Sequence, residues 1–204
     1  MLLKTKHKHL TPLWLIYALF FILGALLLLI YPKGDIVLLL HEHHSIWKDF
    51  FFKYITFLGD GALFGILLLL FWWNNKQYIP LLIGVILVQT IIVQGMKRFV
   101  FAELLRPKGF FENTQEVLHF VEGVSVKVYH TFPSGHTATA FAIATLLALI
   151  MKKQAWSICL AIFAILVGIS RIYLAQHFLV DVFFGSMIGI LTVLLLNYIY
   201  PSNP

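Results

Sequence analysis

Long uninterrupted runs of apolar residues constrain this chain more than any other feature. Several runs reach the roughly 20 residues that a helix needs to cross a bilayer. Strands of a membrane barrel are about half as long and alternate polar with apolar residues, so these runs predict helices. Of the 204 residues, 60% are hydrophobic and 12% are charged, whereas an average soluble domain has about 25% charged residues. The sequence therefore predicts an all-α, polytopic membrane protein.

Six transmembrane helices account for the apolar runs. The segment 46–57, which precedes the second span, is aromatic and interrupted by charges, so we expect an interfacial helix there. The first run, 13–30, is long for a signal peptide and lacks a small-residue cleavage site after it, so we expect it to be retained. The expected spans are 12–31, 57–73, 78–100, 134–151, 155–174 and 178–200.

The lysines indicate how the chain is oriented. With six spans both termini share a side. The tail and short loops of that side contain no acidic residue, and they carry six lysines: Lys4, Lys6, Lys8, Lys76, Lys152 and Lys153. Basic residues dense in short loops are typical of the cytoplasmic face. We expect one membrane-embedded domain, 1–204, in a bacterial inner membrane, with cytoplasmic termini and the polar loop 101–132 outside. The net charge of +6 suits anionic headgroups better than nucleic acid.

Polar residues gather at three places, all on the outer side in this topology. A charge at mid-membrane costs at least ~2.5–3.5 kcal/mol on insertion scales, so these positions need a reason. The clusters are Lys97-Arg98 with Arg106-Pro107, then Pro133-Ser134-Gly135-His136, and then Ser170-Arg171 with His177 and Asp181.

The second cluster suits an anion, because it opens a helix whose first N–H groups lack intrahelical partners. Ser134 can cap that helix or bind a phosphate oxygen, and Gly135 permits close backbone approach. The arginines Arg106 and Arg171 offer planar forks that match phosphate.

The third cluster provides a second imidazole with a carboxylate partner. His177 and Asp181 are four residues apart, and they share one helical face if the helix begins by His177. The carboxylate would orient this imidazole, and His136 would protonate a leaving alkoxide.

These clusters resemble the three-part signature of the type-2 phosphatidic acid phosphatase and haloperoxidase superfamily. That signature reads Lys, six residues, Arg-Pro; then Pro-Ser-Gly-His; then Ser-Arg, five residues, His, three residues, Asp. The second and third parts match residue for residue. In the first part Phe99 occupies the lysine position, so Lys97 lies two residues early and Arg98 one. We favour Lys97, with Arg98 as the alternative, if a short bulge restores the contact.

The resemblance covers residues 97–181 and implies an integral membrane lipid phosphatase that uses neither metal nor cofactor. His177 would attack phosphorus to give a phosphohistidine, with Asp181 orienting it. His136 would protonate the leaving group and later activate water. The phosphate oxygens would be bound by Lys97, Arg106, Ser134, Gly135 and Arg171.

Several functions stay open within and beyond this class. The substrate would be a prenyl diphosphate, phosphatidylglycerophosphate, phosphatidate or a lipid A phosphate. The alternatives are a lipid phosphotransferase that uses another acceptor and a non-catalytic protein that binds or moves lipids. Haloperoxidase chemistry is disfavoured by six spans, and the sequence indicates no oligomeric state.

Two other polar features have plain structural explanations. The histidine-rich run 41–44 lacks cysteines and a spaced second pair, so a solvated loop is favoured over a zinc site. Asp60 lies between Gly59 and Gly61, and we expect it to cap a helix rather than to take part in catalysis.

Overall fold

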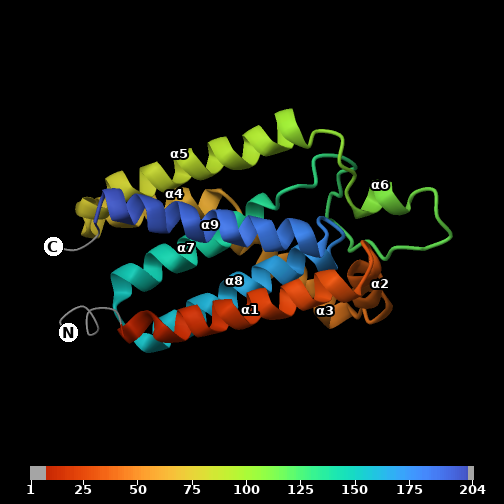
Figure 1. Cartoon of the computed structure of the whole chain (residues 1–204), viewed down its shortest axis with the longest axis horizontal. Helices are drawn as coiled ribbons and strands as arrows, with labels where there is room; N and C mark the ends of the chain where they lie inside the picture. The colour runs from red at the N-terminus through yellow and green to blue at the C-terminus, as the bar shows by residue number, and fades with distance from the viewer. Residues whose placement is uncertain (1–7, 202–204) are drawn as a thin grey trace.

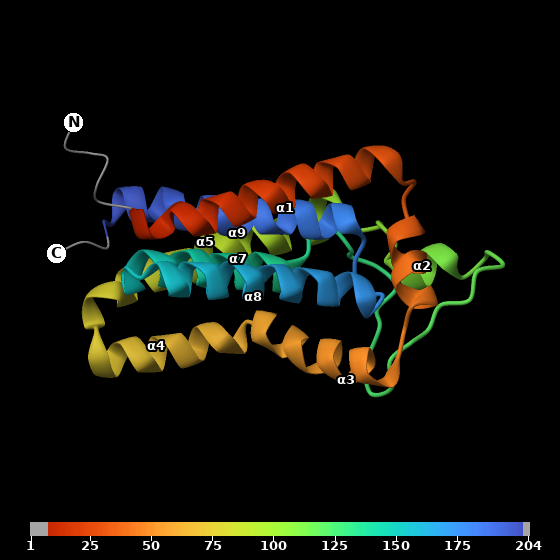
Figure 2. The same cartoon turned by 90° about the horizontal axis from the view of Figure 1, so that it is seen from below.

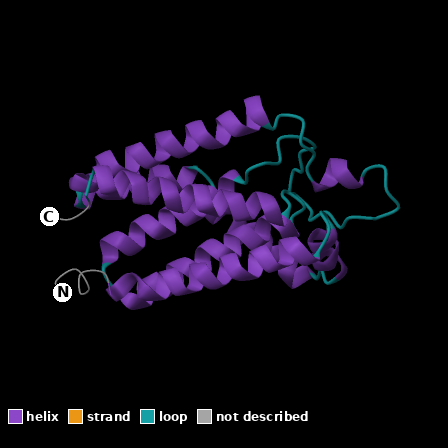
Figure 3. Cartoon of the chain, viewed as in Figure 1, coloured by secondary structure: helices purple, strands orange, loops and turns teal. Residues whose placement is uncertain are grey.

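The computed structural model describes residues 8–201, and within that range every regular element is helical. Lys4 and Lys6 of the expected basic tail lie outside the described residues. Figures 1 and 3 show the long helices running alongside one another, with most of the loop structure at one end. The helices are α1 Thr11–Ile30, α2 Asp35–Glu42, α3 Ile46–Ile55, α4 Ala62–Asn74, α5 Ile79–Gly95, α6 Pro107–Phe111, α7 Gly135–Met151, α8 Gln154–Tyr173 and α9 Leu179–Ile199.

The described residues contain four helical segments long and apolar enough to cross a membrane: Lys8–Ile30, Lys76–Val100, Gln154–Tyr173 and Leu179–Ile199. Helices α3 and α4 meet the same criterion together as a bent pair, which makes five. The apolar helix α7 has 17 residues and is shorter than a typical span. The all-helical membrane fold is thus confirmed, and the sixth span remains a proposal that depends on α7.

Small residues bring α7 and α9 into close contact. A Cβ atom on Gly189 would lie 2.2 Å from the carbonyl oxygen of Ala138, and one on Gly185 would lie 2.6 Å from that of Ser134. Glycine therefore permits a backbone approach that any side chain would block. This packing holds the start of α9 against the start of α7, so the second and third polar clusters become neighbours.

The expected interfacial helix 46–57 and second span 57–73 correspond to α3 and α4, but the chain between the two helices is bent. A tight helical turn, Thr56–Gly59, follows α3, and α4 begins only at Ala62, with a bend of 54° between the two parts. Asp60 accepts a hydrogen bond from the Ala62 N–H at 2.9 Å and so satisfies the first N–H group of α4, although the N-cap residue itself is Gly61. Figure 2 shows α3 and α4 end to end along one edge of the bundle.

Two helices lie where the sequence suggested only loops. The apolar run after Gly34 forms α2, and its last residues include His41 from the histidine-rich run. The short helix α6 begins at Pro107, whose ring fits the first helical position. Both helices lie at the loop-rich end of the bundle (Figure 1).

Candidate active site

The three polar clusters meet at one cavity of about 430 Å³ at the loop-rich end of the bundle. Each cluster contributes two of the residues expected to handle phosphate, and these six side chains or backbones line the wall: Lys97, Arg106, Gly135, His136, Arg171 and His177. The remaining two expected residues, Ser134 and Asp181, are buried behind the wall. The juxtaposition expected from the six-span topology is therefore present in the fold.

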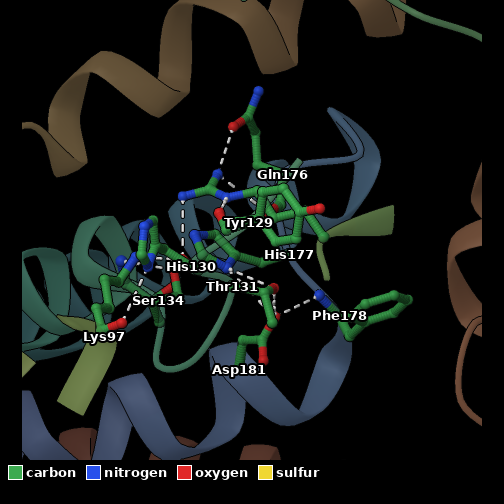
Figure 4. Close-up of polar contacts among 11 residues, drawn as sticks. Lys97, Tyr129, His130, Thr131, Ser134, Gln176, His177, Phe178 and Asp181 are labelled. Carbon is green, nitrogen blue, oxygen red and sulfur yellow. Dashed lines mark hydrogen bonds and ion pairs between the residues drawn. The ribbon is translucent and has the colours of Figure 1, made fainter. Parts of the chain in front are cut away.

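His177 is fixed by a buried hydrogen-bond network (Figure 4). Its side chain is 2% exposed, and its Nδ1 lies 3.3 Å from Oδ2 of Asp181. The same carboxylate oxygen accepts hydrogen bonds from the Phe178 N–H at 2.9 Å and from the Thr131 hydroxyl. Burial lowers the pKa of His177 well below its usual value, and the charges of Arg106 and Lys97 act in the same direction. Both effects favour the neutral form of the ring.

The contact between His177 and Asp181 does not arise from one helical face, as the four-residue spacing suggested. Helix α9 begins at Leu179, so His177 lies before it and Asp181 is its third residue. The carboxylate reaches back to the Phe178 N–H as a helix cap and meets the imidazole there. The His177 N–H donates to the Arg171 carbonyl oxygen at 3.1 Å, which folds the five-residue spacer into a turn.

His136 has looser surroundings than His177. Its side chain is 33% exposed, and its Nε2 lies 3.9 Å from Oδ2 of Asp60, beyond hydrogen-bond distance. The two carboxylate oxygens of Asp60 face different groups: Oδ2 faces His136, and Oδ1 accepts the hydrogen bond from the Ala62 N–H at the start of α4.

Ser134 adopts the capping alternative of its two expected roles. Its Oγ accepts from the Thr137 N–H at 3.4 Å and lies 2.8 Å from the Thr137 hydroxyl oxygen. The residue is fully buried, so its hydroxyl is directed into the protein rather than into the cavity.

The two arginines differ in how their donors are used. The guanidinium of Arg106 donates to the Gln176 side chain at 2.8 Å and to the carbonyl oxygens of Tyr129 and His130 at 3.0 and 3.4 Å. Arg171 donates through Nη1 to the Thr56 hydroxyl at 2.5 Å. Its Nε is buried and has no hydrogen-bond partner within residues 8–201. A buried donor left unpaired beside a cationic cavity is a suitable contact for an anion.

The displaced first motif is accommodated by a wide helical turn. After α5, residues Met96–Val100 form a π-helical turn, a feature that inserts an extra residue into a helix and is frequent at functional sites. Lys97 lines the cavity, and its Nζ donates to the His130 carbonyl oxygen at 3.2 Å. Arg98 is exposed and lies outside the cavity lining. This geometry favours Lys97 over Arg98.

Three uncharged residues support the site and were not identified from the sequence. Thr131 binds the carboxylate of Asp181, Gln176 holds Arg106, and Thr56 holds Arg171. Thr131 lies two residues before the second motif, and Gln176 is the last residue of the spacer within the third motif. This proximity is the only sequence signal that they carry. Thr56 comes from a distant segment, and nothing in its local sequence indicates its role.

Comparison with known proteins defines the class to which this fold and cavity belong. Residues 78–204 match the family model of the PAP2 superfamily, so the chain belongs to that family and the resemblance seen in its motifs is confirmed.

Individual relatives include the undecaprenyl-diphosphatase BcrC of Bacillus subtilis strain 168, with 29% identity over 151 residues and 72% of each chain covered. The bacitracin transport permease protein BcrC of Bacillus licheniformis is 31% identical over 117 residues, 55% of this chain. The match spans 57% of that relative's length.

Two solved structures share the fold. Aquifex aeolicus LpxE superimposes with a TM-score of 0.70 and 30% identity, covering 81% of this chain and 94% of that one. A PAP2-type phosphatidylglycerolphosphate phosphatase from Bacillus subtilis gives a TM-score of 0.63 at 22% identity, covering 92% and 95%.

Proposed function

We propose that this protein is a membrane phosphatase that removes the terminal phosphate from a lipid phosphate or diphosphate through a phosphohistidine. The observation that carries the proposal is the buried pair of His177 and Asp181 at the wall of a cavity whose lining includes five cationic side chains, Lys97, Arg106 and Arg171 among them. Family membership supports the same class of reaction, because the relatives include proteins named as phosphatases of lipid phosphates.

The hydrogen bond to Asp181 determines which nitrogen of His177 reacts. Nδ1 faces the carboxylate, so it carries the proton and donates it. Nε2 then keeps its lone pair, attacks phosphorus and forms the P–N bond as the bond to the leaving oxygen breaks. The phosphorylated ring is cationic, and the carboxylate of Asp181 stabilises that charge.

His136 moves the proton in both halves of the reaction. As the acid it gives a proton to the departing lipid oxygen, and as the base it takes one from the water that attacks the phosphohistidine. That second attack breaks the P–N bond, releases inorganic phosphate and restores neutral His177. Asp60 lies where it can stabilise the protonated ring of His136.

Charge on the phosphate oxygens is offset by groups around the cavity. Lys97, Arg106 and Arg171 supply positive charge, and Gly135 supplies backbone at the N-terminus of α7, where an anion is favoured. Ser134 acts through the cap that orders this helix start. Phosphoryl transfer depends mainly on such positioning and electrostatic stabilisation. The proposed reaction needs no metal ion.

The proposed substrate is a lipid whose headgroup reaches the outer surface of a bacterial inner membrane. The start of α1 and the end of α9 lie at the end of the bundle opposite the loop-rich end (Figure 1), which supports a six-span, single-domain protein with cytoplasmic termini and an outer active site. The undecaprenyl-diphosphatase relative favours a prenyl diphosphate. Phosphatidylglycerophosphate, phosphatidate and lipid A phosphates are the other candidates.

The test is phosphate release by purified protein in detergent from each of these four lipid classes, with His177→Ala as the control. We expect release from at least one lipid without any added acceptor, and no release by the variant. Release that requires an acceptor lipid would instead indicate a phosphotransferase. No release from any lipid, together with unchanged lipid binding by the variant, would indicate a lipid-binding protein. Turnover that EDTA abolishes and added metal restores would contradict the metal-free reaction.

A further inference from the structure

A second polar cluster lies outside the catalytic cavity, where the corner between α2 and α3 meets the outer loop. It consists of His44, Asp49 and His119, and one potential ligand atom from each lies within 4.8 Å of the others. Nε2 of His119 is 2.8 Å from Oδ2 of Asp49, and the rings of His44 and His119 stack with centroids 3.9 Å apart. The histidine-rich run lacked a partner in its own segment, and the fold supplies one from 70 residues beyond Asp49.

We propose that His44, Asp49 and His119 bind a Zn²⁺ ion that ties the outer loop to the α2–α3 corner. Two imidazole nitrogens and one carboxylate oxygen form a ligand set that zinc commonly takes, with a fourth position left for water or another ligand. The inference does not depend on the phosphatase activity, because none of the three residues lines the catalytic cavity.

Neighbouring groups already hold two of the ligands in place. The Tyr173 hydroxyl donates to Asp49. His41 links the outer loop to α8. Its Nδ1 accepts from the backbone N–H of His119 at 3.1 Å, and its Nε2 donates to the Tyr173 carbonyl oxygen at 2.9 Å. Partners of this kind orient metal ligands and are typical of metal sites.

Binding an ion requires two adjustments, and the larger one falls on the exposed residue, His44. Ligand atoms at ~2.0–2.1 Å from a tetrahedral zinc lie roughly 3.3 Å apart, so the contact between Asp49 and His119 needs to open only slightly. The stacked ring of His44 has to turn toward the ion, and it is free to do so at the surface. An adjoining cavity of about 490 Å³ is lined by Glu42 and Glu116, which add negative charge near the cluster.

The cluster is connected to the active site through α8 and the outer loop, although its residues take no part in the proposed reaction. Tyr173, which binds Asp49, lies two residues after Arg171 on α8. The loop that carries His119 continues to His130 and Thr131, which contact Lys97 and Asp181. A bound ion would therefore hold the outer loop in its folded position and raise thermal stability.

The test is zinc binding by the full chain, purified without a histidine tag and stripped with EDTA. Titration calorimetry with Zn²⁺, and the visible absorption of Co²⁺ as a substitute, measure affinity and ligand number. We expect one ion per chain and a higher Tm with zinc. For His44→Ala the affinity should fall by more than the roughly 10- to 100-fold that loss of an outer-shell partner costs, because His44 is itself a ligand. The matched control is His43→Ala, whose ring lies next in sequence and contacts the Leu39 carbonyl oxygen instead; it should bind zinc like the wild type.

Two results would overturn the proposal. One is equal zinc affinity in the wild type and His44→Ala, which would place the ion elsewhere. The other is the absence of a stoichiometric site in the wild type. His44→Ala is the decisive variant because it leaves the contact between Asp49 and His119 in place, whereas His119→Ala removes that contact as well.

Discussion

His177 and His136 line the same cavity, but their rings have different surroundings. His177 is 2% exposed, and its Nδ1 faces a carboxylate that also binds Thr131 and the Phe178 N–H. The ring of His136 is 33% exposed and lies 3.9 Å from a half-exposed carboxylate, that of Asp60. One imidazole is buried and hydrogen-bonded, and the other is partly exposed and has no hydrogen bond to its carboxylate neighbour.

The difference matches the two tasks that the proposed reaction assigns. A nucleophile gains from a fixed line of attack, because correct orientation lowers the entropic part of the barrier. A proton-transfer group has to serve the leaving oxygen first and the attacking water later, so a looser ring is suitable. The following variants test whether rigidity and mobility are divided in this way.

The largest effect is expected for the rigid histidine. His177→Asn keeps a polar side chain beside Asp181 but removes the nucleophile, so kcat should fall on the order of 10⁴-fold or more. Phosphate release measures the loss, and thermal unfolding checks that the variant folds. The control is His43→Ala, an exposed change far from the cavity lining. Residual activity above a few per cent in a folded His177→Asn protein would contradict the assignment.

His136→Ala should lower kcat by about 10²–10⁴-fold, the range for loss of a general acid or base. The loss should be greater for a lipid monophosphate, whose leaving group is an alkoxide, than for a lipid diphosphate. The leaving group of a diphosphate is the lipid monophosphate, which is less basic and needs less help from a proton. Paired kinetics on the two substrates measure this ratio. Equal losses on both would show that His136 does not protonate the leaving oxygen.

The next effect concerns the displaced first motif. Lys97→Ala should lower kcat/KM by roughly 10²-fold, because it removes one positive contact to the transition state. Arg98→Ala, one residue away and outside the cavity lining, is the matched control and should change kcat/KM little. The opposite order would mean that the π-helical turn does not place Lys97 against the phosphate.

The smallest effect is expected at Asp60, the carboxylate next to the more exposed histidine. Asp60→Asn keeps a good helix cap, so Tm should hardly change. It removes a half-exposed charge near His136, and such pairs contribute about 0.2–1 kcal/mol, up to roughly a fivefold fall in kcat. A loss as large as that of His136→Ala would show that Asp60 controls the proton transfer more tightly than its distance suggests.

The membrane helices and two of the three motifs were predictable from the sequence because both depend on local pattern. Apolar run length placed α1, α5, α7, α8 and α9 within a few residues of their observed bounds. The motif at Ser134 and the spacing from Arg171 to His177 are likewise local, and they identified most of the cavity wall.

What the sequence did not predict depends on contacts between distant segments. The bend between α3 and α4 packs against the start of α7, where a Cβ on Gly59 would lie 2.8 Å from the His136 carbonyl oxygen. The hydrogen bond of Thr56 to Arg171 joins residues 115 apart, and the cluster of Asp49 and His119 spans 70. No spacing rule within one segment encodes such pairs.

The most direct test of the account is capture of the covalent intermediate. Purified protein would be mixed with a lipid carrying a ³²P-labelled terminal phosphate, quenched in alkaline detergent during turnover, and digested to locate the label. We predict an alkali-stable, acid-labile phosphohistidine at residue 177 in the wild type and no label in His177→Asn. An active wild-type enzyme that carries no label, or a label that persists in His177→Asn, would contradict the proposed reaction.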